Sequence, residues 1–521
     1  VARKILDPGT SNSVHSYEDY DPHGRVLREV RPNGLVYEYE YDFRGRKVHE
    51  RSISSRGDLV VSWTFSPGGD LIAKLGDARG AVHYEYDYAQ QLTALEDGAG
   101  NRLEFGYDLA GNRVSATYVD PTGTAHRSVA WDYDARNRVR TVTDGDSVEH
   151  YRYDDRGLVV GLHDALGRET RFSYDALRQM TARHDALSIV KRSAPVRYAY
   201  DVHGQLVSVT DPLQRETRYF FDDLGNMLEV KRPESGVFIY QYDGRGNVIA
   251  KIARGRLVEE RAYDLGNRLT RVGFPGRPNA ITYEYDDPDV RGRGRLTRMV
   301  DRQAVTSYRY DDRGNVVEMR QATEEATSSV YYGWDKAGRR KEITYPSGLR
   351  LTFSYDPAGR IDGVDYDTPS SGSGVILRDV RYLPYGPASH WELGNGVRIS
   401  RTFDHGYRLT GIDSRPLKWD IGRDAVGNVV SIDDRSIPDY SQSFEYDVLD
   451  RMVVAHGLFG TRLYEFDSIG NRVGVQFRGA ITGLVPAYEA AGVEFKYEDG
   501  GRLTEIWGGD KALGVYAYNG H

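Results

Sequence analysis

One short phrase, aromatic–Asp–x–x–Gly, recurs throughout this chain of 521 residues. Tyr200, Phe221, Tyr242 and Tyr263 each begin a copy, and successive copies start 21 residues apart. A fixed period of this length is typical of repeat proteins, in which each repeat is one supersecondary unit stacked on its neighbours. With degenerate copies the chain holds about 22 such units. The chain is therefore expected to extend by repetition and not by adding separate globular cores.

Each unit is predicted to be a β-hairpin. Residues before the phrase alternate as in a half-buried strand, as Tyr240 and Tyr242 do. Asp at the first turn position accepts backbone N–H groups, and Gly at the fourth adopts a positive φ at little cost. Pro22 and Pro357 occupy the second position, where a type I turn favours proline. We name this the Tyr-Asp turn.

The hairpin geometry predicts a register. The aromatic residue should face the second residue after Gly, so that Tyr20 pairs with Val26 and Tyr200 with Leu206. Each such pair contributes about 0.2–1 kcal/mol. Asp should face the residue directly after Gly, usually Arg or Asn. The unit at Tyr263 is one residue short by this count, and the unit at Tyr285 is long.

A second turn falls half a repeat away, as in "EDGAGN" (96–101) and "HDALGR" (163–168). We name it the half-repeat turn. The two turns together predict an all-β fold of repeated antiparallel hairpins, one continuous fragment over residues 1–521. Segments 361–400, 429–444 and 477–493 are less regular and are expected to hold loops or decayed repeats.

The residues that we expect to matter are structural turn residues. They are Tyr20, Asp21, Gly24, Tyr107, Asp108, Gly111, Tyr200, Asp201, Gly204, Phe221, Asp222, Gly225, Tyr242, Asp243, Gly246, Tyr310, Asp311, Gly314, Tyr355, Asp356 and Gly359.

Composition and motifs argue against several function classes. The net charge is −8, which implies no general nucleic-acid-binding surface, and a chain without cysteine has no thiolate site. No apolar run is long enough to span a membrane. One Asp per turn does not supply the converging oxygens that Ca²⁺ needs. The sequence lacks HExxH, GxSxG and P-loop motifs. We expect no catalytic, metal or cofactor-binding residues, and no cofactor.

The run of "YDxxGR/N" units resembles the Rhs/YD-repeat family, which includes bacterial Rhs polymorphic toxins, the B–C component of Tc insecticidal toxins and animal teneurins. The resemblance implies a β-sheet strip that spirals into part of a hollow shell. In a bacterial member that shell would sequester a toxic C-terminal cargo of the same polypeptide until delivery. It further implies a secretion-system effector, held in the cytoplasm before export and secreted or delivered with a secretion-apparatus protein as partner. The self-cleavage signature and toxin tail of bacterial members are missing here, so we interpret the sequence as a piece of a longer polypeptide.

Two alternatives remain open at this point. The tyrosine rows would suit a cell-surface adhesion or carbohydrate-binding module, since aromatic rings stack on sugars. An enzyme would need a site hidden in the irregular segments. The first interpretation, a non-catalytic encapsulation module, is the one that we carry forward.

Overall fold

The computed structural model describes residues 2–5, 14–31, 34–54, 57–76, 80–233, 235–278, 280–286, 290–479, 492–497, 503–509 and 511–516. Nearly all of the regular structure in these ranges is β-strand. The strands identified there belong to one 46-stranded sheet. The predicted all-β fold of antiparallel hairpins is confirmed.

The first half of the chain contributes β1 (Ala2–Ile5), β2 (Val14–Tyr20), β3 (Val26–Val30), β4 (Val36–Tyr41), β5 (Lys47–Ile53), β6 (Leu59–Phe65), β7 (Leu71–Gly76), β8 (Gly80–Tyr86), β9 (Leu92–Glu96), β10 (Arg102–Tyr107), β11 (Arg113–Val119), β12 (Ala125–Tyr133), β13 (Val139–Asp144), β14 (Ser147–Tyr153), β15 (Val159–His163), β16 (Glu169–Tyr174), β17 (Met180–His184), β18 (Val196–Tyr200), β19 (Leu206–Thr210), β20 (Glu216–Phe221), β21 (Met227–Arg232), β22 (Gly236–Tyr242), β23 (Val248–Ala253) and β24 (Arg256–Tyr263).

The second half contributes β25 (Leu269–Gly273), β26 (Ile281–Tyr285), β27 (Leu296–Val300), β28 (Val305–Tyr310), β29 (Val316–Ala322), β30 (Thr327–Trp334), β31 (Arg340–Thr344), β32 (Arg350–Tyr355), β33 (Ile361–Thr368), β34 (Gly372–Tyr382), β35 (Ala388–Leu393), β36 (Arg398–Phe403), β37 (Leu409–Asp413), β38 (Lys418–Arg423), β39 (Val429–Asp434), β40 (Gln442–Tyr446), β41 (Met452–Gly457), β42 (Gly460–Phe466), β43 (Arg472–Arg478), β44 (Val493–Tyr497), β45 (Leu503–Gly508) and β46 (Lys511–Val515).

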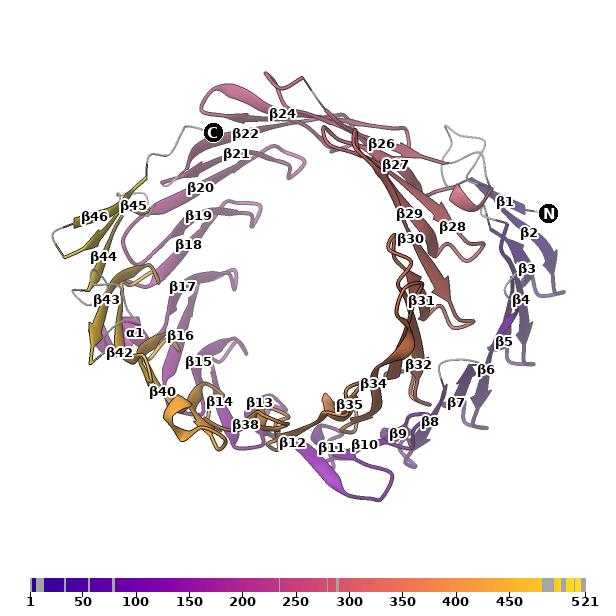
Figure 1. Cartoon of the computed structure of the whole chain (residues 1–521), viewed down its shortest axis with the longest axis horizontal. Coiled ribbons are helices and arrows are strands. Elements are labelled where there is room, and N and C mark those ends of the chain that lie inside the picture. The colour runs from indigo at the N-terminus through magenta and orange to yellow at the C-terminus, as the bar shows by residue number, and fades with distance from the viewer. Residues whose placement is uncertain are drawn as a thin grey trace. The chain divides into compact units, whose positions relative to one another are not determined.

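Strands pair with their neighbours along the chain, so that β14, β15, β16 and β17 lie side by side in that order (Figure 1). The predicted register is confirmed where it was specified. Tyr20 pairs with Val26, and Tyr200 pairs with Leu206, each after a one-residue register shift. That shift is the β-bulge expected when a type I turn closes a hairpin.

Short helices interrupt the described strands at three places. The helix α1 (Ala186–Lys191) begins at Asp185, whose carboxylate accepts the N–H of Ser188 at 2.8 Å. The other two are the single 3₁₀ turns η1 (Val290–Gly292) and η2 (Pro438–Tyr440). No helix among the described residues is both long enough and apolar enough to span a membrane.

The three segments predicted to be less regular differ in outcome. Residues 361–400 contain the paired strands β33, β34 and β35, and "DTPSSGSG" is a hairpin in which Thr368 pairs with Gly372. Residues 429–444 contain β39, η2 and the start of β40. In 477–493, residues 480–491 lie outside the described part of the chain.

The chain divides into two compact units, each built from segments far apart in sequence. Unit 1 comprises Val1–Gly106, Ala116–His126 and Glu259–Ile399. Unit 2 comprises Tyr107–Ser115, Arg127–Val258 and Ser400–His521. The division of residues 1–521 as one continuous repeat fragment stays a prediction.

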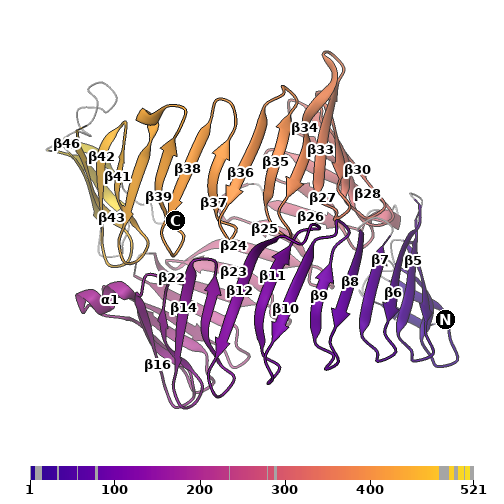
Figure 2. The same ribbon diagram turned by 90° about the horizontal axis from the view of Figure 1, so that it is seen from below.

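Within unit 1 an early stretch of hairpins meets a late stretch edge to edge. Figure 2 shows β33 and β35 above β8 and β9. Arg313 donates to the carbonyl oxygen of Gly57 at 2.7 Å, and Ser54 donates to Asp312 at 3.0 Å. The Tyr385 hydroxyl donates to the carbonyl oxygen of Asn101 at 3.1 Å. We call this line of contact the seam.

Unit 2 contains the same kind of seam. The guanidinium of Arg168 forms two hydrogen bonds with the carboxylate of Asp450, at 2.8 and 3.1 Å. Arg127 lies 5.7 Å from the ring of Tyr407. In both units the early partner belongs to or flanks a half-repeat turn, whereas the late partner belongs to a Tyr-Asp turn. The seam is thus built from two different edges of the repeat.

Candidate functional site

The predicted turn residues occupy equivalent places in successive hairpins. Each aromatic residue is the last residue of its strand: Tyr20 of β2, Tyr107 of β10, Tyr200 of β18, Phe221 of β20, Tyr242 of β22, Tyr310 of β28 and Tyr355 of β32. Each Asp donates its N–H to the carbonyl oxygen four residues on, at 2.8–3.0 Å, and accepts the Gly N–H on its own carbonyl at 2.9–3.1 Å; this set is Asp21, Asp108, Asp201, Asp222, Asp243, Asp311 and Asp356. The φ angles of Gly24, Gly111, Gly204, Gly225, Gly246, Gly314 and Gly359 lie between 81° and 86°.

The turn carboxylate closes the loop with its side chain. In the turn at Asp134, Oδ1 accepts the N–H groups of Arg136 and Arg138 at 2.8 and 3.0 Å. Oδ2 accepts Nε of Arg138 at 2.7 Å. The hydrogen bond from the Arg138 side chain, with the backbone N–H bonds, lowers the pKa of Asp134 to about 2. Asn does the same work elsewhere: the Asn112 side-chain amide is the main cause of the lowered pKa of Asp108.

Arginine also links one repeat to the next. Arg138 lies 4.5 Å from the ring centroid of Tyr153, and its Nη1 donates to the carbonyl oxygen of Asp154 at 3.1 Å. Arg360 repeats the arrangement 4.5 Å over Tyr382. Such cation–π contacts contribute about 0.5–1 kcal/mol at exposed sites. The residue after Gly therefore joins its own turn to the aromatic residue of the following hairpin.

The tyrosine hydroxyl has a role that the sequence analysis missed. Tyr242 donates to the carbonyl oxygen of Met227 at 2.8 Å, and Tyr446 donates to that of Val429 at 2.8 Å. The acceptor is the first residue of the second strand in the preceding hairpin. Trp334 uses its indole N–H in the same way, with Val316 at 2.8 Å. The preference for tyrosine over phenylalanine in the phrase was the available signal.

The units at Tyr263 and Tyr285 were predicted to differ in length from the other repeats. The unit at Tyr263 was predicted to be short, and this is wrong: Asn267 takes φ 60° in the place of Gly and donates its N–H to the carbonyl of Asp264. Asparagine tolerates this left-handed conformation better than most residues. The unit at Tyr285 is long, as predicted, because η1 lies within a loop closed by the N–H of Asp286 and the carbonyl of Arg295.

One face of the strip carries rows of paired charges. The residue before the aromatic points to this face and is exposed in most repeats, as Glu40, Asp132, Arg152, Glu284 and Arg309 are. Some of them face an oppositely charged cross-strand neighbour, as Glu284 faces Arg298 and Arg309 faces Glu318. Arg102 contacts Glu85, Glu96 and Glu104. We call this surface the polar face.

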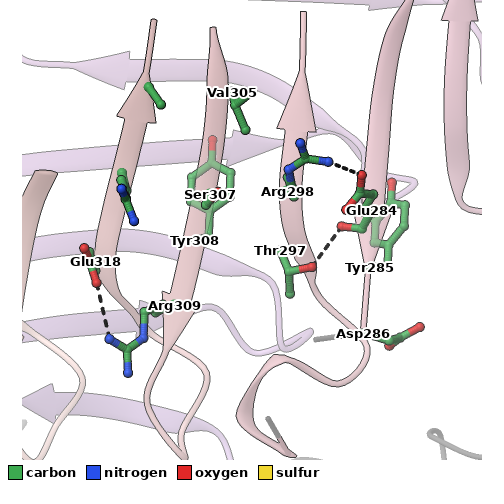
Figure 3. A pocket seen from close by; sticks show the side chains of 12 residues that line it. Glu284, Tyr285, Asp286, Thr297, Arg298, Val305, Ser307, Tyr308, Arg309 and Glu318 are labelled. Carbon is green, nitrogen blue, oxygen red and sulfur yellow. Dashed lines mark hydrogen bonds and ion pairs between the residues drawn. The ribbon is translucent and has the colours of Figure 1, made fainter. Parts of the chain in front are cut away.

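A shallow groove of about 630 Å³ lies on the polar face of unit 1, over β26–β29. Figure 3 shows Arg298 directed at Glu284 and Arg309 directed at Glu318 along its length. Arg309 is 72% exposed and Arg298 is 42% exposed, so these are ordinary solvated ion pairs worth roughly 0–1 kcal/mol. Three acidic and three basic side chains line the groove, so its charge is balanced.

The described residues bring no group of three or more His, Cys, Asp or Glu side chains together in a way that could hold a metal ion. Each turn carboxylate is instead occupied by N–H groups of its own turn, as at Asp21 and Asp243. The geometry supports turn closure at these positions.

Two family models match the chain. The Teneurin YD-shell model matches residues 69–190 and 163–312, and the RHS Repeat model matches residues 334–369. Together they cover the hairpins on both sides of the seam in unit 1 and the early hairpins of unit 2.

Curated relatives are similar over much of the chain. Double-stranded DNA deaminase toxin A of Burkholderia cenocepacia (strain H111) is 26% identical over 61% of this chain, which spans 18% of that protein. Toxin protein Tse5 of Pseudomonas aeruginosa is 26% identical over 66% of this chain, which spans 21% of that protein. The chain thus corresponds to about a fifth of the length of these relatives.

Solved structures show the same fold. The crystal structure of TcdB2-TccC3-TEV aligns with 97% of this chain and 37% of its own, with a TM-score of 0.67 at 14% identity. TcdB2-TccC3 without its hypervariable C-terminal region aligns over the same share with a TM-score of 0.62 at 13% identity. The repeated turns, the family models and the shared sheet agree, and the chain belongs to the Rhs/YD-repeat family.

Proposed function

We propose that this chain is a structural encapsulation module, part of the wall of a β-sheet shell in a bacterial Rhs-type toxin. In this proposal the wall sequesters a toxic C-terminal cargo of the same polypeptide until delivery and takes no part in catalysis. The relatives named above are toxins, and the solved structures that share the fold are toxin components.

The observation that carries the proposal is the polar face. Its side chains are paired with one another, as Glu169 is with Arg152 of another strand and with Arg171 of its own strand. An unfolded polypeptide beside such a surface gains little by burying its apolar side chains against it, because the hydrophobic driving force scales with the apolar area removed from water. A wall of this kind would hold an unfolded cargo without adhering to it.

The seam supports the same proposal. Hydrogen bonds across it reach the backbone carbonyl groups of Gly57 and Asn101, so that the two stretches of hairpins are held edge to edge. The remaining partners follow from this role: a cargo segment, and a secretion-apparatus protein that takes the effector from the cytoplasm to its target.

The test uses a flexible reporter segment, rich in arginine and lysine, fused after His521. We expect trypsin to cleave this reporter on the order of tenfold more slowly than the same reporter fused to an unrelated folded β-protein, because the wall shields it. The variant Gly98→Val, which disturbs the seam, should restore fast cleavage. Equal rates for the chain and the unrelated carrier would contradict encapsulation.

A further inference from the structure

The polar face of unit 2 carries arginine at the same place in three successive hairpins. Arg171 of β16, Arg197 of β18 and Arg218 of β20 each lie three residues before the aromatic residue of a Tyr-Asp turn. Side chains alternate between the two faces of a strand, so this position shares the polar face with the residue directly before the aromatic. We call these three residues the arginine row, and Figure 1 shows their strands following one another along the sheet.

The arginine row is a local feature and not part of the repeat. We refer to Tyr-Asp turns with Asp residues from Asp21 to Asp264 as the early set, and to those from Asp311 to Asp467 as the late set. The three hairpins belong to the early set, and no other Tyr-Asp turn of either set has arginine or lysine at the equivalent position. In the late hairpins of unit 2 this position holds Ser400, Asp420, Ser443 and Leu463.

The outermost charge along the row is positive. Arg197 is exposed, and its guanidinium forms no hydrogen bond or ion pair with any described residue. The other two arginines each contact a glutamate of their own strand. Arg171 is 55% exposed whereas Glu169 is 15% exposed, and Arg218 is 60% exposed whereas Glu216 is 35% exposed. A guanidinium has five N–H donors, so both arginines keep donors for a second carboxylate.

Further cations lie beside the row. Lys231 of β21, which pairs with Glu229 at 3.0 Å, is directly opposite Arg218 across the strands. Like charges in directly opposite positions destabilise a sheet. The connection between β17 and β18 adds Lys191 and Arg192, both exposed. In a chain with a net charge of −8, positive charge gathered at a cost in stability indicates a surface that binds an anionic partner.

The spacing of the row fits an extended polypeptide. Arg197 lies level with Ser173, which is two residues along β16 from Arg171. Arg218 is displaced from Arg197 by the same amount. Neighbouring arginines are therefore two strands and two residues apart, which places their Cα atoms at about 12 Å. An extended chain covers that length in about three or four residues.

A nucleic acid fits the row less well. It carries a phosphate on every nucleotide, and its affinity depends on how many of these phosphates are neutralised. Glu169 and Glu216 lie beside the arginines and would repel the phosphates in between. Carboxylates that recur at every third or fourth residue of an extended chain can each reach one arginine.

We propose that the arginine row is a docking surface for an acidic polypeptide segment in extended conformation, with a carboxylate at every third or fourth residue. Each guanidinium donates to one carboxylate of the partner. Arg197 gains most, because it has no ion-pair partner in the described part of the chain. The proposal goes beyond the wall function and does not require that the chain enclose a cargo.

Fluorescence anisotropy with labelled peptides provides the first test. The probe is a peptide of about twelve residues, long enough to span the row, with glutamate at every third position among glycine and serine. We expect saturable binding to the purified chain at low salt, weakening as salt screens the ion pairs. A peptide of the same composition with its glutamates in one block should bind more weakly. Absence of saturable binding, or equal binding of the two peptides, would overturn the proposal.

The second test uses a row variant and a matched control. The row variant carries Arg171→Gln, Arg197→Gln and Arg218→Gln. Its affinity for the spaced peptide should fall on the order of tenfold, because three charge pairs are lost. The control carries Arg298→Gln, Arg309→Gln and Arg320→Gln, in the groove on the polar face of unit 1. It changes the net charge by the same amount and should leave the affinity unchanged.

The remaining measurements separate docking from other causes. Arg197→Gln alone removes no side-chain hydrogen bond or ion pair to the described residues, and it should still weaken binding about threefold while the thermal midpoint stays that of the wild type. Equal losses in the row variant and the control would show that net charge alone governs binding, and the docking surface would be wrong. A single-stranded oligonucleotide that binds more tightly than the spaced peptide, and loses its affinity in the row variant, would make the partner a nucleic acid and overturn the polypeptide assignment.

Discussion

The early and late Tyr-Asp turns share one phrase and one set of hydrogen bonds, yet their surroundings differ. Asp243 and Asp356 both close their turns through the N–H four residues on, at 2.9 and 2.8 Å. Val202 at an early tip is 92% exposed, whereas Ala337 at a late tip is 3% exposed. The turn is therefore specified locally, and the two residues between Asp and Gly adapt each copy to whatever lies against it.

Acid should have the largest effect and should act on both sets of turns. The pKa of Asp134 is lowered to about 2 in the folded chain by the Arg138 side chain and by backbone N–H groups. A carboxyl group with a depressed folded pKa contributes stability above its unfolded pKa and loses it as pH falls through the folded value. We expect stability to hold above about pH 4 and to fall between about pH 4 and 2. Circular dichroism melts along this pH series check it; a midpoint that is constant down to about pH 2 would contradict the role of the turn carboxylates.

Gly98→Ala should have the next largest effect, because it acts directly on the seam. The added methyl group would lie 2.4 Å from the carbonyl oxygen of Pro357 and would push the late turn away. Overpacking of this kind costs about 1–3 kcal/mol. Gly244→Ala is the matched control in an early turn, because nothing lies within 4 Å of the added methyl group there. The urea unfolding midpoint should fall for Gly98→Ala and not for Gly244→Ala. Equal midpoints would show that the seam accommodates the added methyl group without loss of stability.

Tyr446→Phe and Tyr242→Phe compare the hydroxyl contact in the late and early sets. Each removes one hydrogen bond of 2.8 Å to the preceding hairpin, so each should cost about 1 kcal/mol. The reverse change, Phe221→Tyr, supplies a hydroxyl at an equivalent place and should raise the thermal midpoint. If loss of the hydroxyl leaves the thermal midpoint unchanged in both sets, the tyrosine contributes to stability through its ring alone.

Asp450→Asn should have the smallest effect. It removes the charge that pairs with Arg168, whose side chain is 14% exposed in the seam, while the carboxyl partner is 43% exposed. Partly solvated pairs contribute up to about 1 kcal/mol and weaken with salt. Asp132→Asn, which breaks the more exposed pair with Arg140 on the polar face, serves as the comparison and should change nothing measurable. Thermal melts at low and high salt distinguish the two.

The local structure was predictable because its causes are local. The position of Asp, the conformation of Gly and the cross-strand partner of Tyr200 all depend on residues within a few places of one another. The length of the unit at Tyr263 was predicted wrongly because Gly was taken to mark the fourth turn position, whereas Asn267 adopts the left-handed conformation there.

Longer-range features were not predictable on the same grounds. The hydroxyl of Tyr242 reaches a carbonyl group of the preceding hairpin, which becomes visible only once the spacing of neighbouring hairpins is known. The pairing of turns across the seam is harder to predict, because all the turns carry similar residues. Nothing in the phrase at Asp450 marks it as the partner of Arg168. Repetition makes a hairpin easy to predict and its distant neighbour ambiguous.

Partners across the seam are separated by 256 to 290 residues, which is about 12 to 14 repeats. Insertion of one whole hairpin between them would shift every late Tyr-Asp turn by one repeat. Each would then face the next early half-repeat turn, which has a similar backbone. Such a chain could gain or lose units in evolution and still form the seam, in a register shifted by one repeat. Stability would be lost only where a contact depends on particular residues. Pro357 would no longer face Gly80 and Gly98, and Arg168 would no longer face Asp450.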